Sequence, residues 1–164
     1  MCYKIVKEII AISIIWVLLS FQLEGQEVQE IGVEELTRVL SNESDSTYVV
    51  NFWATWCSPC VKEIGYFEEL HRNYRESGLK VYLVSLDFPN QVDRRVVPFL
   101  KDKDITAEVL LMTNLDYNSW IDRVDPSWSG SIPATLIYRK DRRIFLEKEL
   151  TRSELTMHVN QMLN

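Results

Sequence analysis

Apolar and polar residues follow one another along this chain in patterns that predict strands and helices in turn. Tyr48 to Trp53 (YVVNFW) is a short apolar run rich in β-forming residues, which is typical of a buried strand. Apolar side chains then recur at helical spacing from about Ser58 to Arg75, and Lys80 to Leu86 (KVYLVSL) predicts a second buried strand. Because helical patterns flank the first strand, we expect it to be parallel to a neighbour.

The rest of the chain predicts more elements of both kinds. Pro98 lies inside an apolar stretch, and because proline is tolerated in the first turn of a helix, we expect a short helix from there to about Lys103. Thr151 and Glu154 form a capping box that opens a final helix. The other expected elements are a helical pattern at 33–40, a strand at 108–112, a helix at 115–124, a loop at 125–131, and strands at 134–138 and 143–147. This order predicts an α/β fold: a mixed sheet flanked by helices, with a C-terminal hairpin and helix.

The start of the chain has a different character. Lys4 and Lys7 precede a mostly apolar run from Ile9 to Leu23 (IIAISIIWVLLSFQL). A run of about fifteen residues is short for a bilayer span, which needs roughly twenty, and it suits the apolar core of a signal peptide. We therefore expect residues 1–25 to be a signal peptide or an N-terminal membrane anchor, and residues 26–164 to form one domain.

The overall charge excludes some classes of partner. The formal net charge is −6, with 46% hydrophobic and 26% charged residues, which is ordinary for a globular domain. Nucleic acids and anionic membrane surfaces are bound by basic patches, so an acidic chain argues against both as partners.

Two cysteines carry the chemistry that the sequence suggests. Cys57-Ser58-Pro59-Cys60 falls where the first buried strand is followed by a helix. The free N–H groups and the dipole of a helix N-terminus favour a thiolate on Cys57, and the thiolate is the attacking species in disulfide exchange. Cys60, one turn deeper on the same face, would resolve a mixed disulfide on Cys57. The third cysteine, Cys2, would be removed with a signal peptide.

The stretch from Val50 to Cys60 (VNFWATWCSPC) closely resembles the active-site strand and loop of the thioredoxin superfamily. The resemblance extends from about residue 30 to the C-terminus. It is closest to exported TlpA/ResA-like reductases, which have a signal or anchor and an extra strand–helix insertion, for which residues 90–124 provide the length. The resemblance implies a thioredoxin-like fold and a thiol–disulfide oxidoreductase whose redox group is the cysteine pair, without another cofactor.

A second motif supports this resemblance. Proteins of the superfamily have a cis proline at the start of the strand beside the cysteines, and Ile132-Pro133-Ala134-Thr135 fits that position. The resemblance implies that the Ile132 backbone binds an extended substrate segment and that Trp56 shapes the docking surface. The alternative is an ordinary trans proline at the first residue of a strand.

One residue departs from the pattern of the superfamily. Many thioredoxins have a buried aspartate before the motif that moves the proton of the resolving cysteine, and this chain has Asn51 there. An amide cannot accept a proton at neutral pH. Glu63, three residues past Cys60, and Asp87, at the end of a strand, are candidates for proton transfer; the alternative is that both are solvated surface carboxylates.

Three other kinds of site are alternatives for these residues. A zinc site made from the cysteines with His71 and His158 is disfavoured, because Cys60 and His71 would lie about 16 Å apart along one helix. A peroxiredoxin-like peroxidase is a second alternative, but Thr55 lies two residues before Cys57 where that motif needs three. A purely structural bridge is the third, and its small loop would give little entropic stabilisation.

The direction of electron flow and the partners are less constrained. Ser58 and Pro59 add no charge to stabilise a thiolate, which favours a reductant over a disulfide-forming oxidant. The resemblance implies that the substrates are thiols or disulfides of exported proteins, with cytochrome c maturation as one option. It also implies that a membrane thiol carrier supplies the electrons, and that the protein works outside the cytoplasm, in a bacterial periplasm, as a free or anchored domain.

Overall fold

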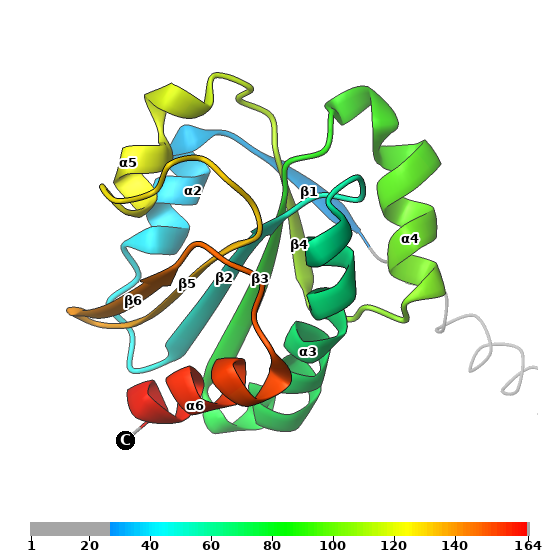
Figure 1. Cartoon of the computed structure of the whole chain (residues 1–164). Helices are drawn as coiled ribbons and strands as arrows, with labels where there is room; N and C mark the ends of the chain where they lie inside the picture. Colours follow the sequence, from blue (N-terminus) through cyan, green and yellow to red (C-terminus); the bar gives the residue numbers. More distant parts are fainter. Residues whose placement is uncertain (1–26, 164) are drawn as a thin grey trace, which may run out of the picture.

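The computed structural model describes residues 27–163, which form one six-stranded mixed sheet with helices on both faces (Figure 1). The strands are β1 (Val28–Ile31), β2 (Thr47–Trp53), β3 (Leu79–Ser85), β4 (Glu108–Met112), β5 (Ala134–Arg139) and β6 (Arg142–Leu146). The helices are α2 (Val33–Leu40), α3 (Ser58–Tyr74), α4 (Val97–Asp102), α5 (Ile121–Val124) and α6 (Arg152–Leu163). The expected signal peptide or anchor at residues 1–25 lies outside the described residues.

The sheet has the strand order β1-β4-β3-β2-β5-β6 and confirms the mixed α/β class expected from the sequence. Strand β2 lies inside it, parallel to β3 and antiparallel to β5, and all seven of its residues are buried. Strands β5 and β6 form the expected hairpin. The C-terminal ends of β2 and β3 lie at the same edge of the sheet, and the chain leaves β2 there to enter α3.

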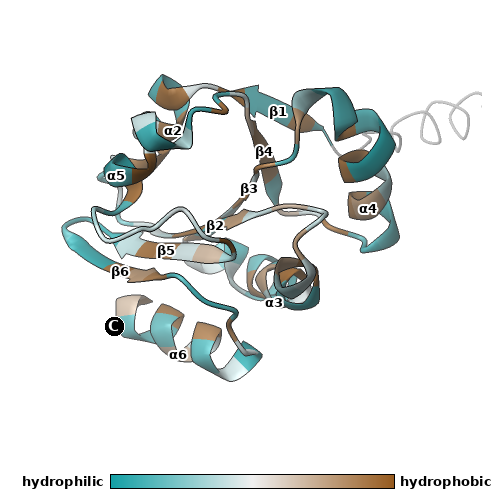
Figure 2. Ribbon diagram, turned by 45° about the horizontal axis from the view of Figure 1, so that its top comes forward, coloured by the Kyte–Doolittle hydropathy of each residue, from teal (hydrophilic) through white to brown (hydrophobic). Residues whose placement is uncertain are grey.

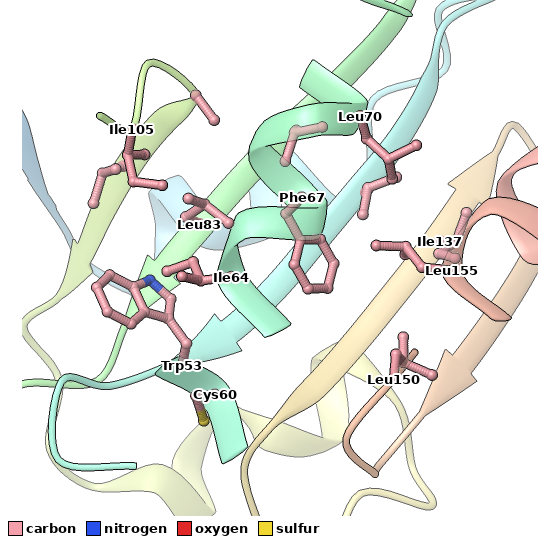
Figure 3. Packing of buried hydrophobic residues seen from close by; sticks show 14 of the residues in the cluster. Trp53, Cys60, Ile64, Phe67, Leu70, Leu83, Ile105, Ile137, Leu150 and Leu155 are labelled. Atoms are coloured by element: carbon pink, nitrogen blue, oxygen red, sulfur yellow. The ribbon is translucent and has the colours of Figure 1, made fainter. Parts of the chain in front are cut away.

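Side chains of β2 alternate between two cores. Val49 and Trp53 pack against residues of α3 and α6, whereas Val50 and Phe52 pack against residues of α2 and α5. In Figure 3, Cys60 lies at one end of the first core, beside Trp53. Figure 2 shows hydrophobic and hydrophilic residues alternating along α4 and α6, as expected for helices with one buried face. Within residues 27–163, every helix falls short of the length and apolar character that crossing a bilayer requires.

Three parts of the structure differ from the sequence-based expectation. Strand β1 was not predicted: two of its four residues are polar, and it forms an edge strand that pairs only with β4 among the described residues. The helix expected to start at Pro98 starts earlier, because the π-helical turn η3 (Val92–Val96) continues into α4. A π turn bonds the Val97 N–H to the Val92 carbonyl, and the helix therefore runs on through the proline.

The third difference concerns the helix expected over 115–124. That segment forms a 3-10 turn, η4 (Tyr117–Ser119), followed by the single turn of α5. The break falls at Trp120, whose backbone is not helical and whose buried indole donates from Nε1 to the Asn114 carbonyl at 3.2 Å. Burial of this large ring among the aromatic residues of the second core therefore outweighs helix propensity.

Candidate redox site

Cys57 and Cys60 form a disulfide at the N-terminus of α3, with Cα atoms 5.3 Å apart. Cys57 is the N-cap residue, and the backbone N–H of Cys60 donates to Cys57 Sγ at 3.3 Å. Pro59 occupies the first turn, where its missing N–H leaves no bond unmade. Both cysteines are buried, but Cys57 keeps 5% of its surface exposed and Cys60 only 1%. Cys57 is therefore the more exposed of the two residues.

Asp87 holds the turn that precedes Cys57 in place. Its carboxylate accepts hydrogen bonds from the backbone N–H of Thr55 at 3.0 Å and from the Thr55 hydroxyl at 2.6 Å. The Ser85 hydroxyl donates to the same carboxylate at 2.9 Å. Asp87 is fully buried, so the expectation that it could be a solvated surface group is wrong. Its oxygens are directed to the Cys57 turn.

Glu63 lies below the disulfide on the buried side of α3 and is also fully buried, which excludes the alternative of a solvated carboxylate. Asn51 Nδ2 donates to Glu63 Oε1 at 3.2 Å, and the backbone N–H of Leu150 donates to Oε2 at 2.6 Å. Asn51 Nδ2 also donates to the Thr135 hydroxyl at 3.1 Å. Burial raises the pKa of Glu63 to about 7, although the hydrogen bonds from Leu150 and Asn51 lower it. This carboxyl therefore exchanges a proton near neutral pH.

The Ile132–Pro133 peptide bond is cis, the geometry that the resemblance implies. Pro133 is buried and directly precedes β5, whose Thr135 pairs with Asn51 of β2. Ile132 is half-buried and packs against both cores, including the one that contains the two cysteines. The structure thus brings the 132–133 motif from a distant part of the chain to the strand that leads into the disulfide.

An apolar hollow of about 210 Å³ lies beside the disulfide loop. Trp56, which is 55% exposed, and Ile132 line it together with Trp128. Two further aromatic residues of its lining were not predicted from the sequence: Phe88, which is 50% exposed, and Tyr117. The only available sequence signal for Phe88 was its position directly after Asp87, in the turn that follows β3. The hollow gives the disulfide edge of the protein an apolar surface.

Two other groups from the sequence analysis stay apart from this site. His71 lies in the last turn of α3, far along the helix from Cys60. His158 lies on α6, a different element from the one that carries the cysteines. Within residues 27–163, no group of three His, Cys, Asp or Glu side chains is arranged to hold a metal ion.

Solved structures with a similar fold define the class of fold. The chain is similar to a thiol:disulfide interchange protein of the thioredoxin family from Chlorobium tepidum TLS (TM-score 0.62, 19% identity), covering 78% of this chain and 85% of that one. It is also similar to a secreted Mycobacterium tuberculosis disulfide oxidoreductase (TM-score 0.56, 18% identity), covering 73% and 84%. The protein therefore has a thioredoxin-like fold.

The sequence places the chain more narrowly. Residues 18–145 match the model of the AhpC/TSA family, and the chain belongs to that family. It is 37% identical over 90 residues to the thiol-disulfide oxidoreductase ResA of Oceanobacillus iheyensis, covering 55% of this chain and 44% of the relative. It is 31% identical over 101 residues to the thioredoxin-like protein YneN of Bacillus subtilis, covering 58% and 59%. The chain thus spans about half the length of these curated relatives.

Proposed function

We propose that the protein is a thiol–disulfide oxidoreductase that reduces disulfides of exported proteins. The observation that carries this proposal is the Cys57–Cys60 disulfide at the N-terminus of α3, beside Ile132 and Pro133. The similarity to relatives named thiol-disulfide oxidoreductases supports the same activity.

Cys57 is the nucleophile in this proposal. A partner dithiol first reduces the Cys57–Cys60 disulfide to two thiols. The thiolate of Cys57 then attacks one sulfur of a substrate disulfide; a mixed disulfide forms, the substrate S–S bond breaks, and the other substrate sulfur leaves as a thiolate that takes up a proton. The helix N-terminus stabilises the attacking thiolate, and the greater exposure of Cys57 makes it the accessible sulfur.

Cys60 completes the exchange, and Glu63 accepts its proton. The Cys60 thiol loses its proton to Glu63, and its thiolate attacks Cys57 Sγ. The mixed disulfide breaks, the internal disulfide re-forms, and the second substrate sulfur leaves as a thiolate that takes up a proton. Glu63 is suited to take that proton, because it lies three residues past Cys60 on the buried face of α3 and its pKa is raised by burial to about 7. Asp87 is assigned a different role, to hold the Cys57 turn, since its oxygens are engaged by Thr55 and Ser85.

The substrate docks on the surface around the disulfide. In this proposal the backbone of Ile132 binds an extended segment of the substrate. The loop before the cis proline has this role in the superfamily. Trp56 and the adjacent hollow supply apolar contact area next to Cys57. A contiguous exposed apolar surface commonly marks a binding site.

The partners and the location follow from the same proposal. The substrates are disulfides of exported proteins, the electrons come from a membrane thiol carrier, and the protein works in the periplasm of a bacterium, free or held by residues 1–25. The apolar run at 9–23 supports export. A role in cytochrome c maturation is a narrower form of this proposal and rests on the TlpA/ResA resemblance alone.

The first test is the reduction of insulin disulfides with dithiothreitol as the electron source. The proposal predicts that the wild-type protein accelerates the reaction and that Cys57→Ser abolishes the acceleration. Unchanged turnover in Cys57→Ser would refute the assigned roles. Rapid consumption of hydrogen peroxide by the reduced protein, without insulin reduction, would favour the peroxidase alternative.

A further inference from the structure

The loop in front of Pro133 is held by a carboxylate from another part of the chain. Glu147, the residue after β6, accepts hydrogen bonds from the backbone N–H of Ser129 at 3.1 Å and of Ser131 at 2.9 Å. The Ser129 hydroxyl donates to the same carboxylate. One carboxylate therefore accepts hydrogen bonds from three donors in a loop of three residues.

Little else fixes this loop from the solvent side. Ser129, Gly130 and Ser131 are all exposed, and Gly130 adopts a positive φ of 93° that favours glycine. From below, Trp128 Nε1 donates to the Ser131 carbonyl at 2.9 Å. The loop is thus held between the indole of Trp128 beneath it and the carboxylate of Glu147 at its edge.

The position of Glu147 explains why it reaches this loop. Leu146 pairs with Thr135 in the β5–β6 hairpin, so Glu147 lies one residue beyond the last pair of the hairpin. At that point the opposing chain turns away into the Ile132–Pro133 bond. Three residues further on, the backbone N–H of Leu150 donates to Glu63. The connector from Glu147 to Leu150 therefore contacts the docking loop at one end and the buried carboxyl at the other.

The charge state of Glu147 suits this task. Partial burial opposes ionisation, but the hydrogen bonds from Ser129 and Ser131 outweigh it and lower the pKa of the carboxyl below its usual value. Hydrogen bonds to an ionised carboxylate are stronger than those between neutral groups. At neutral pH the loop is therefore held by charge-assisted bonds.

We propose that Glu147 is a positioning residue that holds the 129–131 loop so that the Ile132 backbone is presented to a polypeptide substrate. The inference rests on the proposed function, because it concerns how that substrate docks. Glu147 contacts neither cysteine in this role. Its effect is confined to substrates that have a peptide backbone to bind.

The test compares two kinds of disulfide on Glu147→Ala and Glu147→Gln, with Glu43→Gln as the matched control. Glu43 is an exposed carboxylate in the loop before β2, at the opposite edge of the sheet from the disulfide. The rate constants for reduced protein are measured with insulin and with 2-hydroxyethyl disulfide, a small disulfide without a peptide bond, alongside the midpoint potential and the melting temperature of each variant. The rate with the small disulfide depends on the cysteine chemistry alone. The rate with insulin depends on the cysteine chemistry and on docking of the polypeptide.

We expect Glu147→Ala to lower the insulin rate constant by about tenfold, the factor that corresponds to about 1.4 kcal/mol. Glu147→Gln, which keeps one acceptor oxygen, should lie between Glu147→Ala and the wild type. The rate constant with 2-hydroxyethyl disulfide and the midpoint potential should stay unchanged in both variants, and Glu43→Gln should behave as the wild type. If Glu147→Gln lowers both rates equally, or neither, the inference is wrong. If the wild-type protein reduces neither disulfide, the proposed function itself fails, which is a distinct result.

Discussion

Asn51 and Glu63 are joined by a buried hydrogen bond in which Asn51 Nδ2 donates to Glu63 Oε1 at 3.2 Å. Within residues 27–163, Asn51 Oδ1 has no hydrogen-bond partner of its own. Turning the amide by 180° would bring this oxygen to the place of Nδ2, where it could accept from a protonated Glu63 and from the Thr135 hydroxyl. Asn51 can therefore serve both protonation states of Glu63 without accepting a proton itself.

The raised pKa of Glu63 predicts a specific dependence of stability on pH. Folding raises this pKa from 4.5 to about 7, so the folded protein binds more protons than the unfolded chain between those values. The free energy of unfolding should fall as pH rises from about 4.5 to about 7, by roughly 3 kcal/mol from this group. Glu63→Gln should lack this part of the slope. Urea unfolding of the oxidised protein at pH 4.5 and pH 8 measures it, and equal slopes in both proteins would contradict the assignment.

Asn51→Leu should shift the titration of Glu63 upward. The substitution removes the amide donor that favours the charged carboxylate, while burial, the larger effect, stays in place. NMR titration of the Glu63 carboxyl carbon reads the pKa directly, with the wild type as reference. The pH midpoint of the resolving step by Cys60 should move in the same direction. A lower pKa in Asn51→Leu would show that the amide does not stabilise the carboxylate.

The loss of Asp87 should loosen the Cys57 turn without moving that pH midpoint. Asp87→Ala leaves the N–H and hydroxyl of Thr55 and the hydroxyl of Ser85 without their acceptor, at a cost of about 1–3 kcal/mol in the free energy of unfolding. Thr55→Val, which removes one donor and leaves the others, is the milder comparison. Urea unfolding and the pH profile of insulin reduction check both parts. A shifted profile in Asp87→Ala would instead assign proton transfer to this residue.

Trp56→Ala should weaken substrate binding and leave the stability of the protein almost unchanged. The side chain is 55% exposed, so its removal should change the free energy of unfolding by no more than about 0.5 kcal/mol. The KM for a protein disulfide should rise, since the indole lines the hollow beside the cysteines. Steady-state kinetics with insulin and a thermal melt give the two values. A large loss of stability with an unchanged KM would place Trp56 in the core and remove it from the docking surface.

The parts of the fold that could be predicted from the sequence are those where local pattern and burial agree. Strand β2 is buried throughout and mostly apolar, and helix α3 has a regular buried stripe, so both were located within a residue or so. Strand β1 has two exposed residues and little pattern, because it is a short edge strand. The segment after Asn114 follows the burial of Trp120, which local propensity does not encode.

The residues of the candidate site also differ in how far the sequence predicts them. Cys57, Cys60 and Pro133 belong to short motifs with a recognisable spacing, and the sequence was sufficient to single them out. Glu63 could be named from its position on α3, but its burial depends on the contact with Leu150, 87 residues away. Glu147 carried no sequence signal, because its three donors come from a loop that only the β5–β6 hairpin brings near.

The midpoint potential of the Cys57–Cys60 couple tests the central claim most directly. The purified protein is equilibrated in dithiol and glutathione buffers of graded potential, and the fraction of free thiol is measured. A reductase of the proposed kind should give a value near that of thioredoxin, about −270 mV. A value near −120 mV would mark a disulfide-forming oxidant and reverse the proposed direction. A pair that resists reduction across the whole range would be a structural bridge, and that result would contradict the proposed function.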